Sequence, residues 1–145
     1  MSVRHAVPAD RPRLLLLSEQ FQRSFPTSTP VTPDTEQLAR VLDSIMEHGV
    51  ILVWDGADGV TGMFALIFGP HPLTGENTAF EIAWFMTEGA RGGSAALKLI
   101  KAAEDEAKKA GAQVLQAGAP NDRVGHVLGR LGFEPRETTY VKRVT

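Results

Sequence analysis

The residues best suited to binding chemistry form a short loop, Arg91-Gly92-Gly93-Ser94. Apolar residues at helix spacing follow it, so the loop leads into the N-terminus of a predicted helix. The first N–H groups of a helix have no partner within the helix, and the helix dipole adds partial positive charge there. Glycines let a bulky anion approach the backbone, and Arg91 adds a full positive charge. The loop therefore predicts a phosphate-binding site, and a plain strand–helix connection is the alternative.

A single carboxylate, Glu81, lies within the apolar run that precedes this loop, residues 78–86. A charged group inside an apolar strand is costly unless it is paired or used in chemistry. Two interpretations stay open: a group used in acid–base catalysis, or a residue near the end of the sheet that pairs with an arginine. Its apolar neighbours are expected to bury the carboxylate and so raise its pKa. These neighbours are Phe80, Ile82, Trp84 and Phe85.

The other reactive residue types form no recognisable site. The four histidines lie on separate predicted elements without metal-ligand spacing, so no metal is expected. The chain has no cysteine, which excludes a disulfide, a thiolate nucleophile and a zinc–thiolate site. Ser94 only partly imitates the Gly-x-Ser-x-Gly turn of a serine hydrolase, so a nucleophilic role for it is the weakest interpretation.

Hydrophobic periodicity predicts the elements that position these residues. The expected strands are 3–7, 50–54, 60–68, 78–86, 113–117 and 138–144. The expected helices are 11–24, one that runs from Thr32 or Asp34 to about 47, one that ends at Gly111, and one that begins at 120–122. Asp10 is the expected N-cap of the first helix. This order predicts an α/β fold in one domain, residues 1–145, with a mixed, mostly antiparallel twisted sheet and helices on both faces.

Two glycines and one loop have two interpretations each. Gly125 and Gly129 lie one turn apart on the last predicted helix, where glycine costs about 1 kcal/mol relative to alanine. They indicate close approach of another backbone or of a ligand. The proline-rich loop 25–33 is either a connector or a wall of the substrate site.

Composition limits the classes of partner. The net charge of −2 gives no electrostatic footprint for nucleic acid. No apolar run approaches the roughly 20 residues that span a bilayer, and the N-terminal residues lack the apolar segment of a signal peptide. We therefore expect a cytoplasmic protein without a membrane partner, and a homodimer stays open.

The segment Arg91-Gly92-Gly93-Ser94-Ala95-Ala96 resembles the Arg/Gln-x-x-Gly-x-Gly/Ala signature of the GCN5-related N-acetyltransferases (GNAT). Arg91 and Ala96 match the signature, whereas Ser94 stands where the family usually has glycine. Asn121 precedes Gly132-Phe133 by the interval of a second family stretch. The resemblance extends from Val3 to the end of the chain, although only these two stretches are specific.

The resemblance implies an N-acetyltransferase that moves an acetyl group from acetyl-coenzyme A (acetyl-CoA) to a primary amine of a small molecule or a protein, directly in a ternary complex. Glu81 would be the general base, and a backbone N–H near Met86 would stabilise the oxyanion. At the position where the family commonly has a tyrosine as general acid, this chain has Leu128. Tyr140 is therefore the candidate general acid. The cofactor-binding residues would be Phe85, Met86, Arg91, Gly92, Gly93, Ser94, Ala95, Ala96, Asn121 and Gly125. The alternative is an acyl-CoA-binding protein with little turnover, in a regulatory or phage-related role.

Overall fold

The computed structural model describes residues 2–24, 34–91 and 93–145, so the loop 25–33 and Gly92 lie outside the described residues. A five-stranded sheet in the order β1-β2-β3-β4-β5 forms its centre. Its strands are β1 (Ser2–His5), β2 (Val50–Gly56), β3 (Gly59–Pro70), β4 (Asn77–Met86) and β5 (Val114–Gln116). Strands β1 to β4 pair antiparallel, and β5 pairs parallel to β4. The predicted mixed sheet is therefore confirmed.

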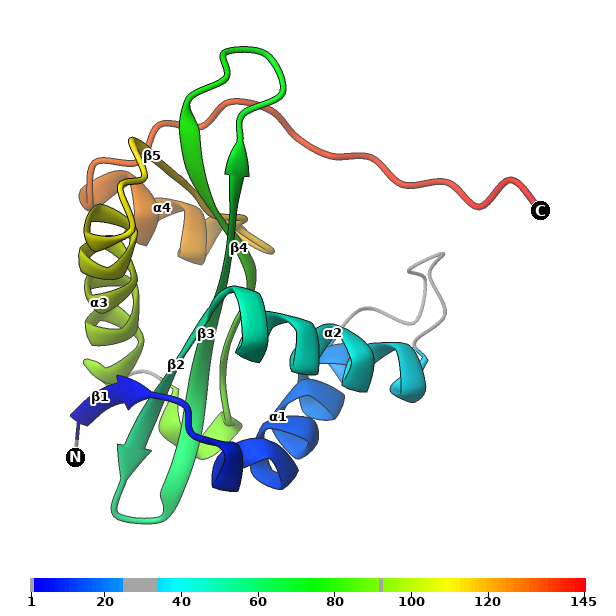
Figure 1. Cartoon of the computed structure of the whole chain (residues 1–145), viewed down its shortest axis with the longest axis vertical. Helices are drawn as coiled ribbons and strands as arrows, with labels where there is room; N and C mark the ends of the chain where they lie inside the picture. The colour runs from blue at the N-terminus through cyan, green and yellow to red at the C-terminus, as the bar shows by residue number, and fades with distance from the viewer. Residues whose placement is uncertain (1, 25–33, 92) are drawn as a thin grey trace.

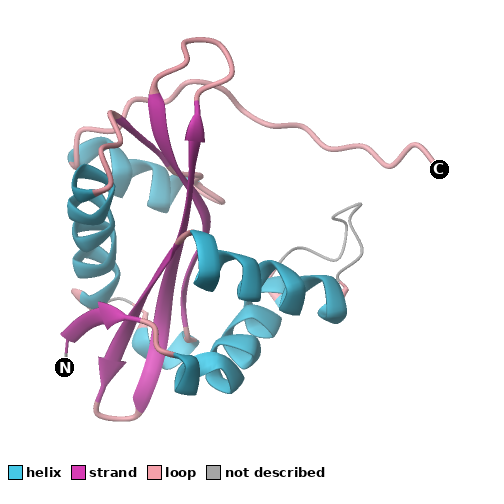
Figure 2. Ribbon diagram, in the orientation of Figure 1, coloured by secondary structure: helices cyan, strands magenta, loops and turns pink. Residues whose placement is uncertain are grey.

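Helices cover both faces of the sheet (Figure 1, Figure 2). The helices are α1 (Arg11–Arg23), α2 (Thr35–His48), α3 (Ala95–Lys109) and α4 (Asp122–Arg130), with short 3₁₀ helices at Pro8–Asp10 and Glu88–Ala90. Alternate residues of each strand point to opposite faces and build two cores. The α3/α4 core contains Leu52, Phe64, Leu66, Ala79, Met86, Leu99, Ile100 and Leu128. The α1/α2 core contains Leu14, Leu17, Leu42, Ile45, Ile51, Val53, Met63 and Phe85.

Local sequence signals place most of the element boundaries. The side chain of Asp34 accepts hydrogen bonds from the backbone N–H groups of Glu36 and Gln37, which caps α2 as predicted. Gly59 takes a φ of 83° in the β2–β3 hairpin, and Gly111 takes a φ of 79° just after α3. Both conformations favour glycine, so these two residues fix where the chain turns.

One predicted strand is wrong, and Asp10 is the N-cap residue of α1 as predicted but does not cap it with its side chain. Residues 138–144 form no strand; the chain is exposed from residue 134 to its end and has no assigned secondary structure there. Asp10 precedes α1, but its side chain makes no capping hydrogen bond to that helix. Its carboxylate accepts hydrogen bonds from the backbone N–H of Val7 and from Arg4 instead. Because Arg4 and the N–H of Val7 occupy the carboxylate of Asp10, its oxygens do not bond the first N–H groups of α1.

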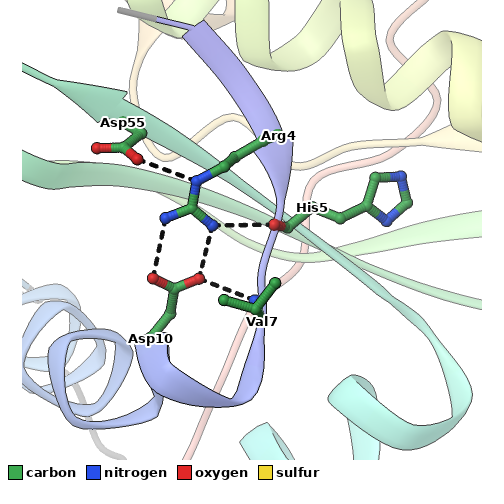
Figure 3. Close-up of polar contacts among 5 residues, drawn as sticks. All are labelled: Arg4, His5, Val7, Asp10 and Asp55. Atoms are coloured by element: carbon green, nitrogen blue, oxygen red, sulfur yellow. Dashed lines mark hydrogen bonds and ion pairs between the residues drawn. The ribbon is translucent and has the colours of Figure 1, made fainter.

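Arg4 links the first strand to two other segments (Figure 3). Its Nη1 and Nη2 atoms donate to the two oxygens of Asp10 at 2.8 and 3.0 Å, and its Nε donates to Asp55 on β2 at 3.0 Å. The pairing with Arg4 lowers the pKa of Asp10, against the effect of burial. This cluster fixes the entry into α1 relative to the sheet.

We expect Arg4→Met to lower the free energy of unfolding by roughly 1–3 kcal/mol, because Asp10 would stay buried without its cation. The deficit should be complete above the unfolded pKa of Asp10, near 3.8, and should shrink as the pH falls through the lowered folded pKa. Denaturant titrations at several pH values measure it. The control is Arg11→Met, which removes an equally bidentate but exposed pair with Asp43 and should leave stability unchanged. Equal losses in both variants would contradict the role given to burial.

Candidate functional site

The sheet opens between β4 and β5. β5 pairs only with Thr78, Ala79 and Phe80 of β4, so the second half of β4 has a hydrogen-bonded strand on the β3 side alone. The β3–β4 register shifts at the same level, because Ala65 faces Ala83 while Leu66 faces Glu81. Ile82 is the extra residue of this β-bulge and is left without a partner in the ladder. Unpaired backbone groups of β4 are thus placed where the two parallel strands separate.

Glu81 lies at this point of separation and is partly buried. It faces Leu66, so its side chain is on the side of the α3/α4 core. Its Oε1 accepts a hydrogen bond from the backbone N–H of Gly118, just after β5, at 3.2 Å. Burial raises the pKa of Glu81, and the hydrogen bond from Gly118 offsets part of that rise. The result is a carboxylate closer to the proton affinity that a base needs near neutral pH.

Two expectations for Glu81 need correction. It takes part in no ion pair within the described parts of the chain, and it lies in the middle of β4 rather than near the end of the sheet. The arginine-paired interpretation is therefore wrong. The expected neighbours divide between the two faces: Phe85 belongs to the α1/α2 core, whereas Trp84 packs on the α3/α4 core, on the side of Glu81 and Leu66. The bulge at Ile82 interrupts the alternation of side chains along β4 and so moves Phe85 to the other face.

The loop after β4 leads into the N-terminus of α3. Ser94 is the N-cap residue, but its side chain makes no capping hydrogen bond. A Cβ built on Gly93 would meet no atom within 4 Å, so open space adjoins the backbone there. Arg91 folds back over the loop: its Nε donates to the carbonyl of Met86 at 3.0 Å, and its guanidinium lies 5.3 Å from the ring centre of Phe85. The first N–H groups of α3 and the open space beside Gly93 are thus compatible with the predicted phosphate site, whereas the guanidinium of Arg91 is held against Met86 and Phe85.

One family model matches most of the chain. The model of the acetyltransferase (GNAT) family matches residues 14–133. The chain belongs to the GNAT family. No curated protein sequence matches it.

Several solved structures share the GNAT fold with this chain at low sequence identity. An acetyltransferase of Trypanosoma brucei has 17% identity and a TM-score of 0.75, and the match covers 99% of each chain. A GNAT family acetyltransferase of Staphylococcus aureus has 15% identity and a TM-score of 0.70, and the match covers 99% of this chain and 100% of that one. The ribosomal-protein-alanine N-acetyltransferase of Brucella melitensis has 14% identity and a TM-score of 0.71, with 99% of each chain covered. At these identities the likeness shows the fold alone.

Members of the GNAT family use acetyl-CoA and an acceptor substrate. The described residues contain no cluster of three histidines, cysteines or carboxylates that could hold a metal ion. No helix within the described ranges is long and apolar enough to cross a membrane.

The residues that the sequence singles out on α4 have different surroundings. The Oδ1 atom of Asn121 accepts a hydrogen bond from the backbone N–H of Val124 and caps α4, which leaves its amide N–H groups as donors. Leu128, at the family's tyrosine position, is 6% exposed and packs in the α3/α4 core. A Cβ on Gly125 would lie 3.8 Å from Ala119, whereas a Cβ on Gly129 would meet nothing within 4 Å. No backbone therefore crowds Gly129.

These two glycines give a paired test. Gly129→Ala and Gly125→Ala should each raise the free energy of unfolding by up to about 1 kcal/mol, because alanine favours the helix. If acetyl-CoA lies along this helix, the same changes should weaken its binding in titration calorimetry. Stabilisation with unchanged affinity in both variants would place the glycines on a surface that the cofactor does not reach.

The structure does not bring Tyr140 to the site. Its side chain is 91% exposed on the C-terminal segment, which extends away from the sheet (Figure 1). Met86, near which the oxyanion donor is expected, pairs with Gly62 at the end of β4, whereas the bulge of β4 is at Ile82. Phe85 and Met86 are each 6% exposed and line the cores beneath the Arg91 loop.

Sequence reasoning missed three groups on or beside β4. The bulge at Ile82 and the N–H of Gly118 depend on pairing between strands distant in sequence, so no local pattern indicates them. The third is Trp84, whose indole N–H is buried without a hydrogen-bond partner among the described residues. The sequence shows only that Trp84 is an aromatic residue with one polar atom. It does not show that the indole N–H is buried without a partner.

Proposed function

We propose that this protein is an acetyl-CoA-dependent N-acetyltransferase that modifies a primary amine by direct transfer in a ternary complex. The observation that carries the proposal is the placement of Glu81. It is a partly buried carboxylate without an ion-pair partner among the described residues, at the point where β4 bulges and leaves β5. The hydrogen bond from Gly118 compensates the charge only in part, so a general-base role explains a carboxylate at that position better than a structural role does.

The residues fit the parts of acetyl-CoA. The pyrophosphate would lie against the first N–H groups of α3, beside Gly93, with Arg91 as the nearby cation. The arm of the cofactor carries two amides, which can pair with the open edge of β4 as an added strand does. The amide of Asn121 and the orphan indole N–H of Trp84 are further candidate donors.

Acetyl-CoA supplies the acetyl group as a thioester, and the chain's own residues handle protons and charge. Glu81, directly or through one water, would take the proton from the ammonium group of the acceptor so that nitrogen has a free electron pair. A backbone N–H of β4 beside the bulge at Ile82, on the edge that β5 leaves, would donate to the carbonyl oxygen as negative charge develops there. The C–N bond would form first, giving a tetrahedral oxyanion, and the C–S bond would then break. The nitrogen would lose its second proton to water, and the leaving thiolate would take a proton from water. The buried Leu128 and the distant Tyr140 both fit a mechanism without a protein general acid.

The second candidate is a GNAT-fold protein that binds acyl-CoA with little turnover. Leu128 favours it, because a buried leucine replaces a proton donor. Ser94 also departs from the family's glycine in the phosphate loop. The two candidates share the cofactor site and differ only in the rate of transfer.

A thiol-release assay separates the two. Purified protein and acetyl-CoA are incubated with a panel of amines that includes polyamines, aromatic amines and peptides with free N-termini. A thiol reagent then measures free coenzyme A. The chain has no cysteine, so the reagent reports only the product. Acceptor-dependent release, lost in Glu81→Gln, supports the transferase. Tight binding of acetyl-CoA with no release above the acceptor-free rate supports the binding protein.

A further inference from the structure

Two polar side chains lie on the same face of β4, on either side of the bulge at Ile82. Glu81 pairs with Leu66 and Trp84 pairs with Phe64, and both of these β3 residues belong to the α3/α4 core. Residues three apart on a regular strand point to opposite faces, so it is the bulge that brings Glu81 and Trp84 to one face. Their partners are separated by two residues of β3, which is about 7 Å along the strand.

The indole of Trp84 carries a donor without an acceptor. Among the buried side-chain polar atoms of residues 2–24, 34–91 and 93–145, Nε1 of Trp84 alone lacks a hydrogen-bond partner. The ring of Phe64 is centred 5.6 Å from the indole and tilted by 47°, but a ring face is at best a weak acceptor. A buried unpaired donor lowers stability, so its presence in a site requires an explanation in terms of what the site binds.

Both residues lie on the part of β4 that β5 has left. β5 pairs with residues 78–80, and within the described ranges no strand pairs with the β5 side of β4 from Glu81 to Met86. The carboxylate of Glu81 extends across this opening, because it accepts a hydrogen bond from Gly118 in the segment after β5. Trp84 lies three residues farther along the same edge. A group that enters between the strands therefore lies next to a carboxylate and an indole on one face.

We propose that the indole N–H of Trp84 donates a hydrogen bond to the carbonyl oxygen of the acetyl group and so acts as a catalytic residue. The proposal rests on the proposed function, in which Glu81 takes the proton of the amine. That amine attacks the carbonyl carbon, so the carbonyl oxygen must lie beside the same stretch of β4. A carbonyl oxygen has two lone pairs, and Trp84 supplies the second donor beside the backbone N–H at the bulge.

The burial of this donor decides which constant it affects. Solvent does not reach Nε1 in the free protein, so the atoms that cover it must move when the acetyl group enters. Once the contact forms, water does not compete for the N–H, and a donor in a water-excluded site stabilises charge more than one in water. The hydrogen bond strengthens as the oxygen becomes negative. Trp84 should therefore contribute to the rate of transfer more than to the affinity for acetyl-CoA.

Nuclear magnetic resonance of the indole N–H groups tests the contact in the wild-type chain. The chain has two tryptophans, Trp54 on β2 and Trp84, so the spectrum of Trp54→Phe assigns both signals. Acetyl-CoA and coenzyme A are the probes, because they differ only in the acetyl group. Saturating acetyl-CoA should move the Trp84 proton signal downfield relative to coenzyme A, whereas the Trp54 signal should not differ between the two probes. This readout needs no turnover.

The rate of transfer gives a second measurement. Trp84→Phe keeps an aromatic ring and removes the N–H, and should lower kcat by on the order of 100-fold. Its Kd for coenzyme A should stay unchanged in titration calorimetry, which also shows that the variant is folded. Trp54→Phe is the matched control: it makes the same substitution away from β4 and should keep the wild-type kcat.

The negative results are distinguishable. If the Trp84 signal responds equally to both probes, the indole contacts another part of the cofactor, and the proposal is overturned. It is also overturned if the signal moves with neither probe although both bind, or if folded Trp84→Phe has the wild-type kcat. If neither probe binds in titration calorimetry, the proposed function itself fails, and the role of Trp84 fails with it.

Discussion

Replacing Glu81 with glutamine is expected to lower kcat by on the order of 100-fold and to leave the Kd for acetyl-CoA nearly unchanged. Glutamine keeps the shape of the side chain and can still accept the hydrogen bond from Gly118. It cannot take a proton, so the acceptor must rely on its small deprotonated fraction. Steady-state rates with the best amine of the panel, measured from pH 5 to 9, should also lose their acidic limb.

Stability gives an independent readout of the same substitution. The folded pKa of Glu81 is raised, so its charged form costs stability as the pH rises above its ordinary value of 4.5. Glu81→Gln should therefore have a higher Tm than the wild type at neutral pH, and the difference should vanish at pH 4 and below. Glu76→Gln, an exposed carboxylate just before β4, should change neither kcat nor Tm. A loss of rate together with a gain of stability is the signature of a functional carboxylate.

Two outcomes would remove Glu81 from the mechanism. A variant with the full rate would show that the acceptor loses its proton to water or to another group. A variant with a lower Tm at neutral pH, and with activity per folded molecule intact, would show that the carboxylate holds β4 to the segment after β5. Measuring Tm and kcat on the same preparation distinguishes these results.

Local periodicity predicts much of this fold because most elements carry their own signals. The apolar spacing of α3, the cap at Asp34 and the glycine turns at Gly59 and Gly111 each depend on residues within one turn or hairpin. Even there, the buried face of α3 includes Ala95 and Leu99, whereas Ala110, which continues the apolar spacing of the helix, is exposed. Packing against β2 and β3 decides such details.

Pairing between distant segments could not be read from the sequence. The bulge at Ile82 turns the apolar neighbours of Glu81 to unexpected faces, and only the register with β3 reveals it. Asp10 has the right residue type for a cap, but Arg4 on β1 competes for it. Residues 138–144 have the composition of a strand, but the structure assigns no strand to them. In each case the local sequence indicates the type of interaction, and the tertiary structure decides which group is the partner.

Gly93→Glu is expected to abolish the rise in Tm that acetyl-CoA causes. A ligand that binds only the folded state adds about 2.7 kcal/mol of stability at a hundredfold excess over Kd. The substitution places a carboxylate in the open space beside the N-terminus of α3, where we expect the pyrophosphate. Like charges then compete for the same N–H groups, and the affinity should fall by at least 100-fold. Arg91→Ala should cost less, about ten- to a hundredfold, because one cation is lost while the backbone donors stay.

The free protein should respond in the opposite direction. A carboxylate near a helix N-terminus stabilises the helix by about 0.3–1 kcal/mol, and no neighbouring atom obstructs a side chain at Gly93. The Gly93→Glu protein should therefore melt slightly higher than the wild type in the absence of acetyl-CoA, which excludes unfolding as the cause of lost binding. Gly89→Glu is the matched control, since a Cβ there also meets nothing within 4 Å and the residue precedes the loop. It adds the same charge away from the α3 amides and should keep most of the cofactor-induced shift. If both glutamates reduce the shift equally, general repulsion rather than a phosphate site at α3 explains the effect.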